Sequence, residues 1–245
     1  AIGDINTAKN YYQKAIAVNS AYAPALTNLG NIELNTGNKQ YGLSLLIKAT
    51  ESDPQLVPAW GNLANAYVQF GKSQEAELST RKAIELNPNL FNSHFLLGSI
   101  LLGQKKLQEA EQPLRKTIEL KPDFFQAHSA LGGLQGELGN IQEAEVSTRK
   151  AIELNPNFTE ASWNLYGLSN SIKEAEERIN QCLKMDQSHL KAKLTLSALK
   201  LHQGDRSLFD NLMESNYQDH PLMRSFRWAE TLPNSPELFF HRWAL

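Results

Sequence analysis

QEAELSTRKAIELNPN, at residues 74–89, returns 68 residues later as QEAEVSTRKAIELNPN at residues 142–157, with Val146 in place of Leu78 as the single difference. A related segment, QEAEQPLRKTIELKPD at residues 108–123, lies halfway between the two. The interval is therefore 34 residues. Similarity at a fixed interval of this length is typical of repeat architectures, in which each repeat is one unit that packs against its neighbours.

Prolines and glycines follow the same interval and predict where helices end. Four prolines lie 34 residues apart: Pro54, Pro88, Pro122 and Pro156. Three glycines share this spacing, namely Gly37, Gly71 and Gly139, and Lys105 stands where a fourth is expected. Glycine supplies the left-handed conformation that ends a helix, and the residue before proline resists helical dihedral angles. Each unit should therefore contain two helices separated by a turn at the glycine. Pro113 lies inside one predicted second helix and should bend it.

Small residues recur where neighbouring helices must touch. The units can be counted as 23–56, 57–90, 91–124 and 125–158, and the position of a residue within its unit is called its place. The eighth place holds Gly30, Ala64, Gly98 and Gly132, the twentieth holds Gly42, Ala76, Ala110 and Ala144, and the twenty-seventh holds Ala49, Ala83, Thr117 and Ala151. Small side chains at these places let two helices approach closely.

With Trp60, Leu63, Ala64, Tyr67, Gly71, Ala76, Ala83 and Pro88 in this order, the unit resembles the tetratricopeptide repeat. The resemblance implies an all-α fold, a right-handed superhelical solenoid of antiparallel helix pairs. We expect residues 1–22 to be a truncated repeat with only its second helix, cut from a longer array, and residues 23–158 to be four regular units. Residues 159–215 should form two degenerate units. Residues 216–245 are predicted to be non-repeat helices, either a cap or a linker to a further domain.

Composition excludes several classes of function. The 24 Lys and Arg residues nearly balance the 26 Asp and Glu residues, so no electrostatic attraction to nucleic acid or to an anionic membrane is expected. The longest apolar run, at residues 95–103, is far shorter than the roughly 20 residues of a membrane span. A single cysteine rules out an internal disulfide framework and favours a reducing compartment. These features together favour a cytoplasmic location.

The second, sixth, ninth and thirteenth places of each first helix point away from the packing places. In two consecutive units they hold Pro24, Asn28, Asn31 and Asn35, then Pro58, Asn62, Asn65 and Gln69. A solvated face is one interpretation. However, asparagine is a poor helix former, and an amide both donates and accepts hydrogen bonds, so it can pair with an extended peptide backbone of any sequence. We therefore predict that the six amide residues of this set form a peptide-binding concave face.

The predicted face extends to Phe95 and Ser99, which would line a shallow pocket, and to Asn164 in the first degenerate unit. Phe95 is equally well interpreted as partly covered core. The row of asparagines is similar to the repeat array of the O-linked GlcNAc transferases, and this resemblance implies a protein partner. Some tetratricopeptide domains grip a terminal carboxylate with Lys or Arg. Here the fifth place holds no cation: its residues are Thr27, Gly61, Phe95, Ser129 and Trp163.

No catalytic motif is present, because the sequence lacks a phosphate-binding loop, a nucleophile elbow and an HExxH motif. His94 and His128 share the fourth place of adjacent units, where packing is favoured over a metal site. Cys182 is interpreted as a buried core residue. We expect a scaffold with no cofactor, no metal and no enzymatic activity. One alternative is the substrate-recruiting arm of a larger glycosyltransferase or of a methyltransferase dependent on S-adenosylmethionine. Another is self-association through the exposed ends of the solenoid.

Overall fold

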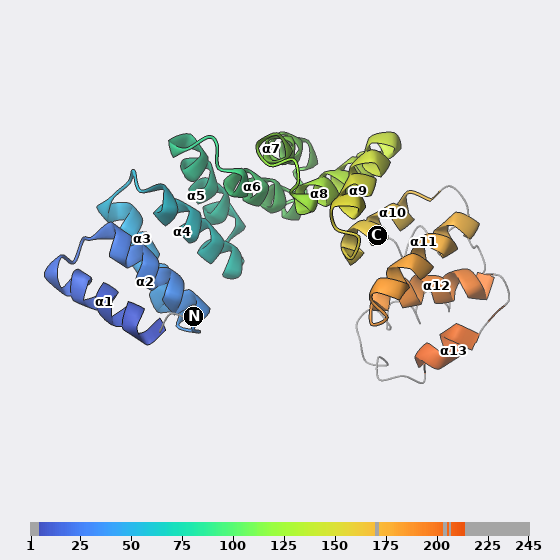
Figure 1. The fold of residues 1–245 in the computed structure, drawn as a ribbon, viewed down its shortest axis with the longest axis horizontal. Coiled ribbons are helices and arrows are strands. Elements are labelled where there is room, and N and C mark those ends of the chain that lie inside the picture. Colours follow the sequence, from blue (N-terminus) through green and yellow to red (C-terminus); the bar gives the residue numbers. More distant parts are fainter. Residues whose placement is uncertain (1–4, 170–171, 203–204, 206, 214–245) are drawn as a thin grey trace. The chain divides into compact units, whose positions relative to one another are not determined.

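The computed structural model describes residues 5–169, 172–202, 205 and 207–213, and all the regular secondary structure within them is helical (Figure 1). The predicted all-α solenoid of repeated helix pairs is confirmed. The chain divides into two compact units, residues 1–134 and 135–245. The non-repeat helices expected at 216–245 lie outside the described residues.

The first compact unit begins with a single helix, and helix pairs follow it. The helices are α1 (Ile5–Val18), α2 (Ala23–Asn35), α3 (Lys39–Ser52), α4 (Val57–Gln69), α5 (Ser73–Leu86), α6 (Phe91–Gly103) and α7 (Leu107–Leu120). Helix α8 (Phe125–Glu137) spans the division between the two units. The second unit continues with α9 (Ile141–Leu154), α10 (Thr159–Gly167), α11 (Ile172–Met185), α12 (Leu190–His202) and α13 (Ser207–Met213).

The turn inside each pair has the left-handed residue that the sequence predicts. The φ angles of Gly37, Gly71 and Gly139 are 99°, 68° and 81°. Lys105 takes the same role with a φ of 60°, although it carries a side chain. Behind it, the N–H of Lys106 donates to the carbonyl of Leu101 at 2.9 Å, which closes the helix end in the manner of a Schellman motif. The turn geometry is therefore kept even where glycine is absent.

A Lys105→Gly variant should be more stable than a Lys105→Ala variant by about 0.5–1 kcal/mol. Both variants lose the lysine side chain, but only glycine adopts a positive φ without a steric penalty from Cβ. Thermal unfolding followed by circular dichroism measures the difference. Equal melting temperatures for the two variants would contradict a left-handed residue at this turn.

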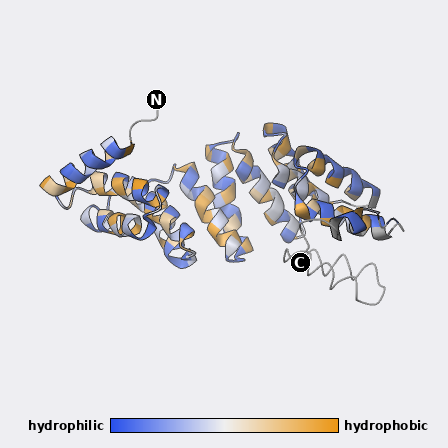
Figure 2. Cartoon of the chain, turned by 90° about the horizontal axis from the view of Figure 1, so that it is seen from below, coloured by the Kyte–Doolittle hydropathy of each residue, from blue (hydrophilic) through white to orange (hydrophobic). Residues whose placement is uncertain are grey.

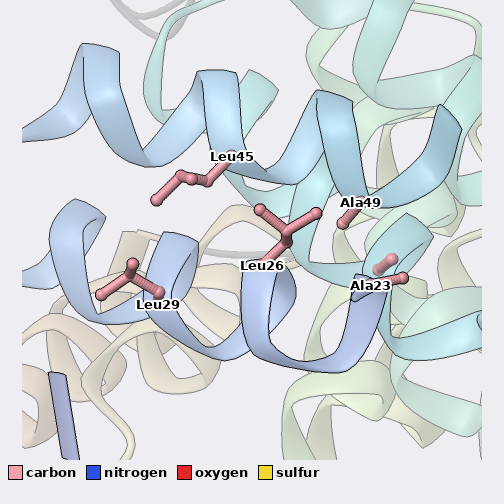
Figure 3. Packing of buried hydrophobic residues seen from close by; sticks show 6 residues of the cluster. Ala23, Leu26, Leu29, Leu45 and Ala49 are labelled. Atoms are coloured by element: carbon pink, nitrogen blue, oxygen red, sulfur yellow. The ribbon is translucent and has the colours of Figure 1, made fainter. Parts of the chain in front are cut away.

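Apolar side chains fill the space between the two helices of a pair. Hydrophobic and hydrophilic residues alternate around the helices, as expected for amphipathic elements (Figure 2). In the first pair, Leu26 of α2 points toward α3 between Leu45 and Ala49, and all three side chains are buried (Figure 3). Ala23 and Leu29 belong to the same cluster. The core is thus a series of small clusters, each built between neighbouring helices.

Glycine is required where α2 crosses α3. A β-carbon added at Gly42 would lie 2.7 Å from the carbonyl oxygen of Gly30 and 2.8 Å from the backbone nitrogen of Leu34. Both contacts are with backbone atoms, which cannot rotate away as a side chain can. By contrast, a β-carbon at Gly61, in the middle of α4, would meet nothing within 4 Å. The two glycines therefore have different physical roles.

Gly42→Ala should destabilise the protein by about 1–3 kcal/mol, because the backbones of α2 and α3 must separate to admit the methyl group. Gly61→Ala is the matched control, and it should raise stability by up to about 1 kcal/mol through helix propensity alone. Urea denaturation of both variants gives the comparison. A loss of stability in both variants, or in neither, would contradict the close crossing.

Pro113 does not end the second helix of its pair. Helix α7 runs from Leu107 to Leu120 through the proline. The ring removes the N–H that would have bonded to the carbonyl four residues earlier, so one helical hydrogen bond is lost. The hydroxyl of Thr117 donates to the carbonyl of Pro113 at 2.8 Å and so binds the next turn of the helix.

Candidate functional site

The predicted ligand face is accessible on the first helices. Across residues 23–158, none of the described residues at the second, sixth, ninth and thirteenth places is buried, whereas every residue at the seventh and eighth places is. We define the amide face as the six amide residues of the first two repeats. They are Asn28, Asn31 and Asn35 on α2, and Asn62, Asn65 and Gln69 on α4. Helices α2 and α4 contact each other directly, so the two rows adjoin.

Most of these amides extend into solvent. Asn62 is half-buried, and the other five are exposed. The Nδ2 group of Asn65 donates to the carbonyl of Gly61 at 3.1 Å, and that of Asn35 lies 3.5 Å from Oδ1 of Asn31. Asn28 and Asn62 make no side-chain hydrogen bond to another described residue. The amide face therefore retains donors and acceptors that a ligand can use.

The remaining predicted residues lie elsewhere. Phe95 and Ser99 are half-buried on α6, one repeat further along, and the Ser99 hydroxyl donates to the carbonyl of Phe95 at 2.9 Å. The Phe95 ring contacts Phe124 edge to face, with 5.0 Å between the centroids. Asn164 is half-buried in the second compact unit, so it does not belong to the amide face.

A buried carboxylate ties α2 to its neighbours, and sequence reasoning missed it. The Glu33 side chain is only 3% exposed, and its Oε1 lies 2.8 Å from Nζ of Lys9 on α1. Asn38 donates to its Oε2 at 2.6 Å. Gln135 and Asn140 repeat this hydrogen bond at 2.6 Å in the second unit. The signal in the sequence is a polar residue at the eleventh place followed five residues later by asparagine.

The partners of Glu33 keep it ionised. Burial alone would raise the pKa of this carboxyl, but the hydrogen bonds from Lys9 and Asn38 and the positive charge of Lys9 outweigh burial. The net effect holds the pKa of Glu33 below its ordinary value of 4.5. A carboxyl whose pKa is lowered on folding stabilises the protein above its unfolded pKa, and that contribution is lost as the pH falls through the folded value.

Lys9→Met should destabilise the protein by about 1–3 kcal/mol at pH 7, since a buried carboxylate loses its cation. With burial then dominant, the pKa of Glu33 should rise above its unfolded value, so the loss of stability relative to the wild type should be largest near neutral pH and should shrink as the pH falls and Glu33 is protonated. Lys14→Met, at an exposed position of the same helix, is the control. Melting temperatures between pH 3 and pH 8 provide the test. Identical profiles for the two variants would show that the ion pair contributes nothing.

Ion pairs also join successive repeats through their second helices. Glu77 of α5 lies 3.0 Å from Nζ of Lys106, at the start of the next second helix, and 2.9 Å from the guanidinium of Arg81. In the second unit, the buried Arg178 lies 3.4 Å from Glu145 and also donates to the carbonyl of Leu165. These contacts hold neighbouring repeats in a fixed register.

The two histidines considered for a metal site each contact a proline carbonyl in the loop before their helix. The Nε2 atom of His94 lies 2.8 Å from the carbonyl oxygen of Pro88, and that of His128 lies 2.9 Å from the carbonyl oxygen of Pro122. The indole N–H of Trp60 makes the same contact with Pro54 at 2.9 Å. A carbonyl oxygen only accepts hydrogen bonds, so each Nε2 must carry a hydrogen and has no lone pair for a metal. These rings fasten the loop between repeats.

The remaining features to consider are the single cysteine, possible metal ligands and possible membrane-spanning helices. Cys182 is buried, and burial together with the nearby Asp186 raises the pKa of its thiol to about 11, so it stays protonated at neutral pH. Among the described residues, no three His, Cys, Asp or Glu side chains are grouped so as to hold a metal ion. Nor does any helix in this part of the chain have the length and apolar character needed to cross a membrane.

Three segments of the chain are similar to a known family of repeats. Three models described as tetratricopeptide repeat match residues 57–90, 80–112 and 125–158. A comparison with curated protein sequences gives no significant match. Three solved structures illustrate the similarity of fold.

The chain is similar to YrrB, a tetratricopeptide repeat protein described as having an unusual peptide-binding site. The TM-score is 0.65, the identity is 21%, and the match covers 79% of this chain and 97% of YrrB. PilF of Pseudomonas aeruginosa matches with a TM-score of 0.69 and 21% identity over 84% of this chain and 96% of its own. A chain of the Cut9–Hcn1 hetero-tetramer has a TM-score of 0.72 and 16% identity, covering 91% of this chain and 46% of that one.

Proposed function

We propose that the chain, three segments of which match tetratricopeptide repeat models, is a non-catalytic interaction scaffold. Its amide face, on the concave side of the solenoid, would hold an extended segment of a protein partner. The single observation that carries this proposal is the accessibility of the six amides on two adjoining first helices. YrrB, which shares the fold, is described as having a peptide-binding site.

The geometry of the amides suits an extended backbone. Asn28, Asn31 and Asn35 lie three and four residues apart, so they form one stripe along α2. The stripe is about 10 Å long at 1.5 Å per residue, which corresponds to roughly three residues of an extended peptide. Each amide offers donors and an acceptor, as a peptide backbone does. Such a surface recognises main chain and tolerates variation in side chains.

The stability cost of these residues supports a functional role. In a helix interior each asparagine is less favourable than alanine or glutamate by roughly 0.5 kcal/mol. Four of them, at Asn28, Asn31, Asn62 and Asn65, therefore cost about 2 kcal/mol. Three of the four positions, all except that of the half-buried Asn62, are exposed and place no packing demand on the side chain, so stability alone would favour Glu, Lys or Ala there.

The surroundings of the amides favour a neutral segment over a terminal carboxylate. Thr27, at the fifth place of the first full repeat, is buried, and its hydroxyl donates to the carbonyl of Ala23 at 2.8 Å. Gly61 holds the same place in the next repeat. Neither residue supplies the cation that a carboxylate clamp needs. The partner segment is therefore expected to be internal and extended.

Changing Asn28, Asn31, Asn62 and Asn65 together to alanine should abolish peptide binding or weaken it at least tenfold, while helicity stays the same or rises slightly. The probe is a peptide selected by the wild-type protein from a displayed library of random 12-residue sequences. Its dissociation constant is measured by fluorescence anisotropy. Equal affinity for the variant and the wild type would refute the role of the amide face.

The matched control removes four exposed amides from the other layer of helices. Gln40 of α3, Gln74 of α5, and Gln108 and Gln112 of α7 are all exposed, and their joint change to alanine should leave binding unchanged. A second probe is the same peptide methylated on alternate backbone nitrogens, which removes donors without changing side chains. If the amides recognise main chain, methylation should weaken binding more than alanine substitution of the peptide side chains does.

A further inference from the structure

The third repeat, formed by α6 and α7, carries a different type of side chain from the other repeats at two places. The fifth place holds Phe95, where the neighbouring repeats have Gly61 and Ser129. The thirty-first place holds Lys121, whereas the corresponding residues of other repeats are Asp or Asn: Asp53, Asn87 and Asn155. The repeats thus act as an internal comparison, in which a residue that departs from the common pattern is not explained by the shared fold.

These departures meet in one place. The ring of Phe124 lies edge to face against Phe91 and Phe95, with centroids 5.3 Å and 5.0 Å apart. The ammonium of Lys121 lies 4.7 Å from the centroid of Phe91 and 5.7 Å from that of Phe124. All four residues are half-buried. We call Phe91, Phe95, Phe124 and Lys121 the aromatic corner.

Local structure does not require Lys121. In other repeats the Asx side chain accepts a hydrogen bond from the backbone N–H two residues later, at 3.0 Å for Asp53, 3.1 Å for Asn87 and 3.2 Å for Asn155. Lysine has no acceptor, so the third repeat gives up this bond. In its place, a cation lies over two aromatic rings, and Lys121 forms no ion pair with any described residue.

Packing does not require Phe95 either. The equivalent place in the preceding repeat is Gly61, where an added β-carbon would meet nothing within 4 Å. The repeat therefore closes its core without a side chain at the fifth place. Phe95 adds a large apolar ring at a place that is open in the preceding repeat, and part of that ring remains accessible.

We propose that the aromatic corner binds an aromatic side chain of the partner segment, with an acidic residue beside it in the sequence. Aromatic rings prefer edge-to-face and offset-stacked neighbours, and the half-buried rings of this corner already pack edge to face, so a further aromatic side chain can join the cluster. Lys121, which is not paired within the described chain, complements a carboxylate. This inference rests on the proposed function, because the segment concerned is the one that the amide face holds.

The test compares the sequences that different variants select from the same displayed library of random 12-residue peptides. The wild type should enrich peptides that carry Phe, Tyr or Trp next to Asp or Glu. Phe95→Ser, which restores the residue type of Ser129, should still select peptides but without the aromatic preference. It should also bind a wild-type-selected peptide about tenfold more weakly. Lys121→Asn, which restores the Asx residue, should lose only the acidic preference.

The outcomes separate the two proposals. Two results would overturn the aromatic corner and leave the scaffold function standing. In the first, the wild type enriches peptides that show no aromatic preference. In the second, Phe95→Ser selects peptides with the same aromatic preference as the wild type. The proposed function itself would be overturned if the wild type enriched no peptide more strongly than the variant that lacks four asparagines. Phe95→Leu keeps the apolar volume and provides a folded variant if Phe95→Ser is too unstable. It should reduce the aromatic preference without affecting thermal unfolding.

Discussion

The first helix pair is held at a separation that glycine alone permits, because a β-carbon at Gly42 would lie 2.7 Å from the carbonyl oxygen of Gly30. Small residues also hold these two places in the second pair, where Ala64 and Ala76 are fully buried and admit a close, though not identical, crossing. Once this contact is fixed, the helical periodicity decides which other side chains are buried. The seventh place falls in the core and the ninth is left unburied. The amide face is therefore a consequence of the crossing.

The fold is largely predictable from the sequence because every repeat carries the same information. A helix end that would be ambiguous once is specified several times, by Gly37, Gly71 and Gly139. Even the exception supports the pattern, since Lys105 adopts the positive φ that the register demands of it. The agreement of local propensity, hydrophobic period and turn residue at each repeat is what makes the prediction secure. Helix α7 continues through Pro113, and the bend expected there stays a prediction.

The contacts between repeats were less predictable, because they depend on where side chains meet in space. The hint near Glu33 in the sequence is Asn38, five residues later, and it does not reveal the cation Lys9, which lies 24 residues earlier on another helix. His94 and His128 were compatible with packing and with metal binding. Only the position of a proline carbonyl beside each ring distinguishes the two. For the amide face, the structure adds accessibility and the adjacency of α2 and α4, while peptide binding stays a prediction.

A scaffold that reads only main chain would have little ability to choose between partners. Each hydrogen bond from a side-chain amide to a peptide backbone contributes a net free energy of about 0.5–1.5 kcal/mol, as is typical of neutral groups. This contribution does not depend on the sequence of the peptide. Selectivity then requires a side-chain contact in a partly enclosed site, and aromatic anchors commonly provide it. In this chain, the first two repeats both carry amides at the same places, and the third carries Phe95 and Lys121, which depart from the residues that the other repeats have at those places. Affinity and selectivity would thus be encoded in different repeats, so that changing one need not disturb the other.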